Sequence, residues 1–287
     1  MGLSMVTVQS DQTDAGRNYP ENLYRSDNRA TLLPTVDHID EAAVDRYHAD
    51  GYVAVGTLFD PARIDAALTG LNSLLLDPRG AGIEFEVGVG DRLADLDAEA
   101  RMNVVRKFMW FADHDERLRT LARDPVLMDV ARRLIGDQDI ALIQDMALLK
   151  PPGGGREKPW HQDNAYFNIE PGTPIVGVWI ALDDATPENG CMHVLPGSHR
   201  EGPVLHFQRR DWQICDSDVQ IWRDLVVPLP AGGALFFDGL IHHGTPANRT
   251  NRRRRAVQFH YAPATAVRVT DERRMELFGS EGKNVSC

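Results

Sequence analysis

The amino-acid sequence predicts a mainly β protein with flanking helices, in which a β-sandwich or jelly-roll is covered by helices from the N-terminal part. Helical patterns are confined to the chain before Gly136. Beyond it, short apolar runs rich in Val, Ile, Phe and Trp are separated by Gly, Pro and Asn turns, which is typical of a sandwich or jelly-roll. A chain of 287 residues with 43% hydrophobic and 25% charged residues can form such an architecture as one domain.

The helices are predicted from their start and stop signals. The segment 40–48 has an acidic first turn, and Gly51 follows it as a helix stop. Asp60-Pro61 and Asp124-Pro125 each place an N-cap residue before a proline at the first helical position. The second of these helices is expected to end at Gly136. These amphipathic segments need a surface to cover, and only the β region that follows can supply it.

Strands are predicted wherever an apolar run is bounded by turn residues. The last of these runs, 256–261, alternates with a period of two, as a half-buried strand does. The glycine-rich stretch from Gly80 to Gly90 is expected to be a mobile loop, because no helix or Lys-Ser/Thr pair follows it to make a phosphate site. The predicted strands are 52–55, 140–150, 173–182, 192–195, 226–229, 234–237 and 256–261.

Composition limits the possible partners and locations. The formal net charge is −11, which disfavours a general nucleic-acid binder or a protein of anionic membranes. No apolar run approaches the ~18 residues of a membrane span, and the first residues lack a targeting signal. We expect a cytoplasmic protein with a flexible tail over residues 1–35 and a single domain over 36–287. The sequence does not predict its oligomeric state.

The candidate functional site is a set of two histidines and one carboxylate. His161 and Asp163 are two residues apart, so on an extended segment both side chains point to one side while Gln162 points away. A second histidine follows about eighty residues later, at His242 or His243. Two imidazoles and one carboxylate are the facial triad that holds non-haem Fe(II) and leaves the opposite side of the metal open. An arginine eleven residues after His243 favours that histidine over His242 as the ligand.

These motifs resemble the phytanoyl-CoA dioxygenase family of Fe(II)/2-oxoglutarate-dependent oxygenases. The resemblance covers residues 40–265 approximately, and it implies a double-stranded β-helix core of the jelly-roll or cupin-like type. The motifs that carry it are Trp160-His161-Gln162-Asp163, Val178 to Ala185, Glu188-Asn189-Gly190-Cys191, Leu195-Pro196-Gly197-Ser198-His199, Gly233 to Phe237, His243-Gly244-Thr245, Asn248-Arg249-Thr250 and Arg254 to Tyr261.

The resemblance implies an enzyme that uses Fe(II), 2-oxoglutarate and O2 to hydroxylate or otherwise oxidise a C–H bond of a small organic molecule. Succinate and CO2 are the implied co-products. Related halogenases carry a small residue in place of the carboxylate ligand, so the presence of Asp163 favours hydroxylation or a related oxidation. The alternative is a catalytically silent member that keeps the fold as a ligand-binding module.

Individual roles are also implied by the resemblance. His161, Asp163 and His243 would bind the metal. Arg254 would pair with the distal carboxylate of 2-oxoglutarate, since a planar guanidinium suits a carboxylate better than an ammonium does. The further candidates for the co-substrate site are Thr245, Trp179, Lys107 and Gln144.

The substrate itself is not predicted by the sequence. Asn164, Tyr166 and Phe167 directly follow the ligand segment and are candidate substrate-binding residues, although aromatic residues at such positions are often part of the core. The segments 80–90 and 211–223 are expected to line the pocket, because loops on a rigid scaffold usually carry specificity. His193, His199, His206 and His260 are expected to be structural or surface residues.

Overall fold

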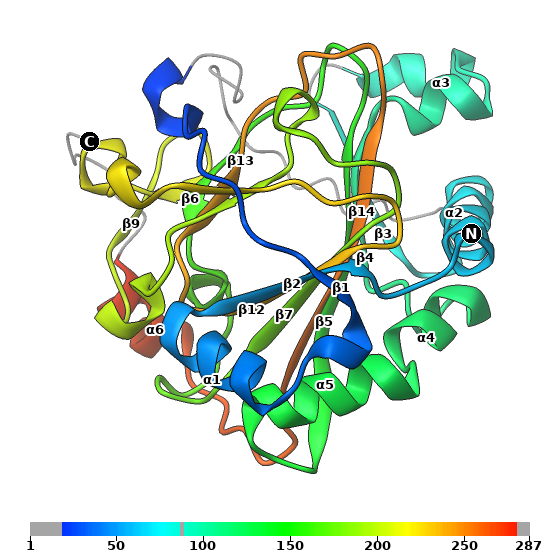
Figure 1. The fold of residues 1–287 in the computed structure, drawn as a ribbon. Helices are drawn as coiled ribbons and strands as arrows, with labels where there is room; N and C mark the ends of the chain where they lie inside the picture. Colours follow the sequence, from blue (N-terminus) through cyan, green and yellow to red (C-terminus); the bar gives the residue numbers. More distant parts are fainter. Residues whose placement is uncertain (1–18, 87–88, 280–287) are drawn as a thin grey trace.

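The computed structural model describes residues 19–86 and 89–279 (Figure 1). Two sheets form the centre of the fold, an eight-stranded sheet ordered β1-β2-β12-β7-β14-β5-β4-β3 and a four-stranded sheet ordered β11-β8-β13-β6. All strand pairs in them are antiparallel except β1 with β2. This is the mainly β jelly-roll that the sequence predicts. A separate two-stranded hairpin is formed by β9 (His206–Gln208) and β10 (Trp212–Ile214).

The strands of the large sheet are β1 (Leu33–Thr35), β2 (Tyr52–Thr57), β3 (Gly82–Phe85), β4 (Val105–Met109), β5 (Ile140–Lys150), β7 (Val176–Ala181), β12 (Ala234–Asp238) and β14 (Arg254–Pro263). Those of the small sheet are β6 (Lys158–His161), β8 (Met192–Val194), β11 (Leu225–Val227) and β13 (His243–Thr245). The α-helices are α1 (Glu41–Asp50), α2 (Pro61–Leu76), α3 (Ala98–Met102), α4 (Glu116–Ala122), α5 (Pro125–Ile135) and α6 (Asp271–Phe278). Short 3-10 helices are η1 (Glu21–Tyr24), η2 (Val36–His38), η3 (Gly90–Asp95), η4 (Asp163–Tyr166), η5 (Pro187–Asn189), η6 (Ser198–Glu201), η7 (Asp216–Asp218) and η8 (Ile221–Arg223).

The predicted helix signals are confirmed. Asp40, Asp60 and Asp124 are the N-caps of α1, α2 and α5, and each carboxylate accepts a backbone N–H from the first turn. Gly51 and Gly136 follow α1 and α5 in the left-handed conformation, with φ of 83° and 77°. Glycine adopts this conformation at little steric cost, so both helices end where the sequence indicates.

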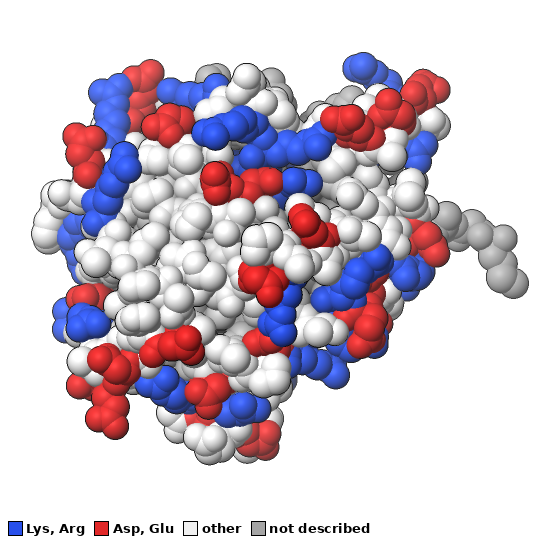
Figure 2. All heavy atoms as spheres, turned by 45° about the vertical axis from the view of Figure 1, so that its right-hand side comes forward, with Lys and Arg blue, Asp and Glu red and all other residues white. Residues whose placement is uncertain are grey.

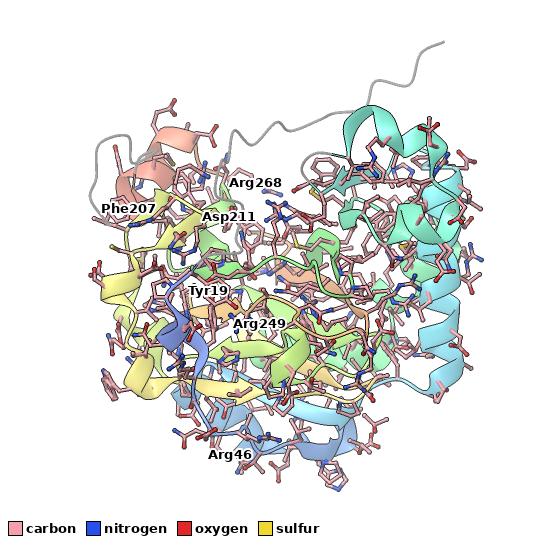
Figure 3. All side chains as sticks on the ribbon, turned by 90° about the horizontal axis from the view of Figure 1, so that it is seen from above. Tyr19, Arg46, Phe207, Asp211, Arg249 and Arg268 are labelled. Carbon is pink, nitrogen blue, oxygen red and sulfur yellow. The ribbon has the colours of Figure 1, made fainter. Side chains whose placement is uncertain are left out.

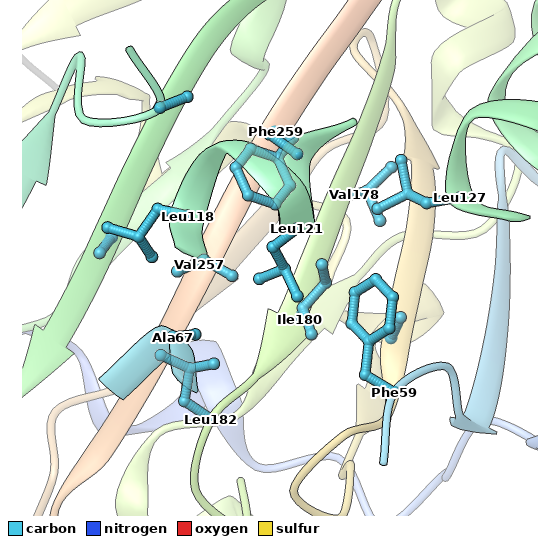
Figure 4. Close-up of a cluster of buried hydrophobic side chains, with 14 of the residues drawn as sticks. Phe59, Ala67, Leu118, Leu121, Leu127, Val178, Ile180, Leu182, Val257 and Phe259 are labelled. Carbon is cyan, nitrogen blue, oxygen red and sulfur yellow. The ribbon is translucent and has the colours of Figure 1, made fainter. Parts of the chain in front are cut away.

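One face of the large sheet packs against the helices. Val178, Ile180, Val257 and Phe259 project from β7 and β14 into a cluster completed by α2, α4 and α5 (Figure 4). All four are completely buried. Burying each such side chain contributes roughly 1.5–3 kcal/mol, so this layer holds the sheet in place.

The opposite, inner face of the large sheet faces the small sheet. Strand register arranges its side chains in rows that run across several strands. One row passes through Met109, Met146, Gln258 and Trp179, and another joins Gln144 to His260 and Gly177. A third runs through Lys107, Leu148 and Ala256, and a fourth pairs Lys150 with Arg254. This register places all of these side chains on the same side of the sheet.

The predicted tail boundary is wrong for residues 19–35. Leu33 pairs with Val55 in β2, and Leu23 is only 2% exposed. The hydroxyl of Tyr19 accepts the N–H of Ala247, and its ring lies beneath the guanidinium of Arg249 (Figure 3). Aromatic side chains in this stretch cover the small sheet, which a polar composition did not reveal. Residues 1–18 lie outside the described residues. The single domain over 36–287 and the cytoplasmic location stay predictions.

The segment 80–90 is also more ordered than predicted. Residues 82–85 form β3, which pairs with β4 and makes the edge of the large sheet. Glycine-rich segments lack the apolar alternation that signals a strand, so only the tertiary pairing identifies this one. Residues 87–88 lie outside the described residues. The other predicted pocket segment, 211–223, contains β10, η7 and η8.

Candidate metal centre

His161 and His243 are brought together by strand pairing in the small sheet. They are directly opposite partners on β6 and β13, and their ring centroids are 4.2 Å apart. Asp163 follows at the start of η4, and its Oδ1 lies 3.2 Å from Nε2 of His161 and 3.5 Å from Nε2 of His243. One ligand atom from each of the three lies within 4.8 Å of the others, and all three side chains are buried. This group could hold a metal ion.

The second nitrogen of each imidazole is held by a backbone carbonyl. Nδ1 of His161 lies 2.7 Å from the oxygen of Pro159, and Nδ1 of His243 lies 3.0 Å from that of Ile241. A carbonyl can only accept, so each Nδ1 carries the hydrogen and each Nε2 turns its lone pair toward Asp163. Burial, together with the nearby His243 and Lys158, lowers the pKa of His161 to about 4. His161 is therefore neutral near pH 7, the form that binds a metal.

Asp163 does not lie on the strand that carries His161. Strand β6 ends at His161, Gln162 remains extended, and Asp163 begins η4. The side chain of Gln162 still points away, because its amide nitrogen donates to the carbonyls of Gly202 and Leu240. The sequence correctly predicts the relative directions of these side chains but not the 3-10 turn. That turn is stabilised by tertiary contact, since the N–H of Asn164 donates to Gly239.

The outer oxygen of Asp163 is bound by two side chains of β14. Oδ2 lies 2.7 Å from Nε2 of His260 and accepts a hydrogen bond of 2.9 Å from the amide of Gln258. Burial alone would raise the pKa of this carboxyl, but His243, His260 and His161 hold it well below its ordinary value. The carboxylate is therefore ionised, with Oδ2 occupied and Oδ1 directed to the histidines.

His260 was expected to be a structural or surface residue, and the structure places it in the interior beside Asp163. It is completely buried and contacts a candidate metal ligand. The alternation in 256–261 already places Gln258 and His260 on one face of a strand. Only the packing of the two sheets shows that this face points at Asp163.

His242 lies outside the group that could hold a metal. Its backbone N–H donates to the hydroxyl of Ser198, and its ring is buried away from Asp163. The other histidines have structural contacts. Nδ1 of His193 lies 2.9 Å from Asp224, His206 accepts the N–H of Gln162, and Nε2 of His199 lies 3.1 Å from the carbonyl of His48.

Arg254 is a buried cation without an acidic partner in the described part of the chain. Its side chain is 2% exposed and donates from NH1 to the carbonyl of Leu148, while its Nε has no hydrogen-bond partner there. The guanidinium carbon lies 5.4 Å from the ring centre of Trp179. Burial lowers the pKa of Arg254 to about 10, so it remains charged near pH 7. A buried, unpaired guanidinium is costly unless an anion binds it.

The remaining candidates for the co-substrate site lie on both sheets, and only Trp179 directly contacts this arginine. Trp179 is beside it on β7, and its indole nitrogen has no partner among the described residues. Thr245 is buried on β13, two residues beyond His243. Lys107 and Gln144 are half-buried on the inner face, where Nζ of Lys107 lies 3.0 Å from Glu84. The structure thus places Trp179, Lys107 and Gln144 on the inner face of the large sheet and Thr245 on the small sheet.

The candidate substrate residues are placed in different surroundings. Tyr166 is 39% exposed, its ring lies edge-on to His161 at 5.8 Å, and its hydroxyl contacts Trp212 and Lys158. Phe167 is buried with its ring 4.9 Å from His260, in a separate apolar cluster. The side-chain amide oxygen of Asn164 is buried without a partner in the described residues. Of the three, Tyr166 is the one placed to meet a molecule that approaches His161 from outside.

A jelly-roll with two histidines and one carboxylate converging between its sheets defines the class of non-haem metal proteins of the cupin-like fold. The model of one family, Phytanoyl-CoA dioxygenase (PhyH), matches residues 47–256 of the 287. The chain therefore belongs to the phytanoyl-CoA dioxygenase family.

Curated relatives agree with this assignment. The chain is 33% identical over 172 residues to a probable phytanoyl-CoA dioxygenase of Caenorhabditis elegans, covering 55% of this chain and 54% of that protein. It is 30% identical over 191 residues to phytanoyl-CoA dioxygenase domain-containing protein 1 of Mus musculus, covering 64% and 65%. The matches thus span about half to two thirds of these relatives.

Solved structures share the fold. EvdO2 of Micromonospora carbonacea var. aurantiaca, complexed with 2-oxoglutarate, has a TM-score of 0.65 at 24% identity, covering 86% of this chain and all of that one. The epimerase SnoN, in complex with Fe3+, alpha ketoglutarate and nogalamycin RO, has a TM-score of 0.64 at 25% identity, covering 81% and 88%. Both of these proteins thus bind 2-oxoglutarate, and SnoN also binds an iron ion.

The surface charge and the helix composition bear on which surroundings the protein suits. Acidic and basic side chains are interspersed around a broad area without charged residues on the face drawn in Figure 2, so the acidic excess is not gathered in one patch there. None of the helices in the described residues combines the length and apolar composition of a bilayer-crossing segment.

Proposed function

We propose that this protein is an Fe(II)- and 2-oxoglutarate-dependent oxygenase that hydroxylates, or otherwise oxidises, a C–H bond of a small organic molecule. One observation carries the proposal. A buried arginine that has no acidic partner among residues 19–86 and 89–279 lies between the two sheets that also hold a His-Asp-His group. A metal and a dicarboxylate together would satisfy both features, whereas a metal alone would leave Arg254 unpaired.

The donor set fits iron. Two neutral imidazoles and one carboxylate suit Fe(II), and three protein ligands leave positions for a bidentate co-substrate and oxygen. His161, Asp163 and His243 would hold the ion. When bound, Fe(II), 2-oxoglutarate and O2 supply the oxidising chemistry, with succinate and CO2 as co-products.

Residues of both sheets would hold the co-substrate. Arg254 would bind its distal carboxylate through paired N–H donors, and the hydroxyl of Thr245 would donate to the same group. Trp179 would cover the chain of the co-substrate and exclude water from it, since its ring is completely buried beside Arg254. Lys107 and Gln144, which remain partly accessible on the same face, would contact its other end.

The adjacent histidines offer a matched pair for testing the metal site. In purified protein loaded with Fe(II), succinate formed from 2-oxoglutarate is measured in the presence of candidate substrates. We expect His243→Ala to lose bound iron and succinate formation, and His242→Gln to keep both within about threefold. Wild-type protein that binds Fe(II) but neither binds nor turns over 2-oxoglutarate would show a silent ligand-binding member instead.

A further inference from the structure

The inner face of the large sheet is partly exposed along β4 and β5. On β4 and β5, Met109, Met146 and Leu148 are half-buried, although they point toward the interior of the fold. Their row partners on β14 and β7, such as Gln258 and Trp179, are buried. On this face a molecule from solvent would therefore meet the side chains of β4 and β5. The half-buried side chains of Met109, Met146 and Leu148 are called the accessible floor. It begins beside the metal ligands, because Gln258, in the same row as Met109 and Met146, donates to Asp163.

Trp110 stands at the end of β4 in an unusual conformation. Its φ is +56°, and apart from Arg79 no other described residue except glycine has a positive φ. Such a backbone costs roughly 1–2 kcal/mol for a residue with a side chain. The indole is 58% exposed, so burial of the ring does not offset the cost of this backbone conformation. Backbone strain of this kind concentrates at functional sites.

Buried contacts hold this conformation in place. The backbone N–H of Trp110 donates to the carbonyl of Asp145 at 3.4 Å, and the N–H of Phe111 donates to the Asp145 carboxylate at 2.6 Å. Phe111 is completely buried in the helix-covered core. Since the next residue is anchored, the turn at Trp110 is fixed and its ring has a defined direction.

The ring lies on the accessible floor. Gly82 pairs with Met109, so a Cβ at Gly82 would point to the inner face, and it would meet ring carbons Cε3 and Cζ3 of Trp110 at 3.2 Å. The indole therefore packs against the glycine backbone at the edge of the sheet. Gly82 contacts the ring, and the side chain nevertheless remains 58% exposed.

Strand spacing gives the distance from this ring to the metal site. Gly82, Met109, Met146 and Gln258 are successive partners on β3, β4, β5 and β14. Neighbouring strands are about 4.8 Å apart, so Trp110 lies on the order of 10–15 Å from the side chain that binds Asp163. A molecule that reaches from the metal to this indole has the length of a fused-ring compound.

We propose that Trp110, Met109 and Met146 form a binding surface for a flat, apolar ring system in the substrate. The inference rests on the proposed function and specifies the substrate class for that site. An exposed indole held in a fixed position favours stacking with another ring, and methionine sulfur makes favourable contacts with aromatic rings. Trp110 is thus a specificity-determining residue that acts away from the atom to be oxidised.

The neutral naphthalene dye prodan tests this surface. Its binding to the full chain, loaded with Ni(II) and saturated with 2-oxoglutarate, is followed by the blue shift of its emission. We expect Trp110→Asn to weaken binding about tenfold or more and Trp110→Phe to keep it within about threefold. Asparagine tolerates the left-handed backbone, so this variant is expected to fold, as urea unfolding would verify. Trp222→Ala is the matched control, since Trp222 is 77% exposed and lies elsewhere, on η8.

Competition with prodan distinguishes a surface that binds aromatic rings from one that binds alkyl chains. We expect naphthol to displace prodan at lower concentrations than decanol does. Equal affinity of wild type and Trp110→Asn, or stronger displacement by decanol, would overturn the ring-binding surface while leaving the proposed function intact. A wild type that binds no 2-oxoglutarate in a separate titration would overturn the proposed function itself, whatever prodan does.

Discussion

Asp163 uses its two carboxylate oxygens in opposite directions. Oδ1 faces the two histidines, whereas Oδ2 is bound by Gln258 and His260 from the other sheet. A carboxylate held in this way presents a single oxygen to a metal and leaves more of the coordination sphere open. The two residues of β14 are therefore positioning residues for the proposed ligand.

Loss of His260 is expected to loosen this carboxylate. Partners that orient a metal ligand typically contribute 10–100-fold in metal affinity, so His260→Phe should weaken Co(II) or Fe(II) binding by about that factor. Isothermal titration measures it, and His260→Gln, which keeps an N–H donor, should recover part of the loss. Wild-type affinity in His260→Phe would contradict the positioning role.

Neighbouring arginines on β14 separate the co-substrate site from the surface. Arg254 is buried on the inner face, but Arg255 pairs with Asp183 at 2.7 Å on the other face. Arg254→Lys should weaken 2-oxoglutarate binding about tenfold or more without changing metal affinity, because an ammonium cannot make the paired hydrogen bonds. Arg255→Lys should leave 2-oxoglutarate affinity unchanged. A titration in which the two variants behave alike would remove Arg254 from the proposed role.

Among the elements, the end of β5 connects the two sheets through Lys150. This buried ammonium donates to the carbonyls of Arg156 at 2.7 Å and Thr245 at 3.1 Å, and also to that of Pro246. Lys150 thereby joins β5, the loop that precedes β6, and β13, which carries His243. Burial, with Arg254 nearby, holds the pKa of Lys150 well below its ordinary value.

Replacing Lys150 by methionine should destabilise this junction. Three buried carbonyls would lose a donor, at a cost of about 1–3 kcal/mol for each group that stays unsatisfied. We expect a lower urea midpoint together with weaker 2-oxoglutarate binding, since Thr245 would lose its fixed position. Gly136→Ala, which strains the end of α5 far from the site, should lower stability without changing 2-oxoglutarate affinity. Equal 2-oxoglutarate affinity in Lys150→Met would argue against the connection.

Local signals explain which elements the sequence could predict. N-caps and terminal glycines are read from adjacent residues, so α1, α2 and α5 were predicted correctly, as were long strands such as β5. The edge strand β3 and the 3-10 turn at Asp163 depend on partners distant in the sequence, and these were missed. The His-Asp-His set follows from motif order, but the contact of His260 with Asp163 arises only when the sheets pack.

At the scale of the whole molecule, each sheet contributes one half of the proposed site. The small sheet holds His161 and His243, and the large sheet holds Arg254 and the residues that orient Asp163. The helices on the outer face of the large sheet fix its position (Figure 4). A single 2-oxoglutarate molecule would therefore bind the metal held by one sheet and the arginine of the other sheet.

An anaerobic optical titration tests this claim most directly, because a visible charge-transfer band arises when 2-oxoglutarate chelates Fe(II). Wild-type protein with Fe(II) should develop the band on addition of 2-oxoglutarate, His243→Ala should not, and Arg254→Ala should require at least about tenfold more 2-oxoglutarate. A wild type that shows no band at saturating 2-oxoglutarate, or an Arg254→Ala variant with an unchanged titration, would contradict the account.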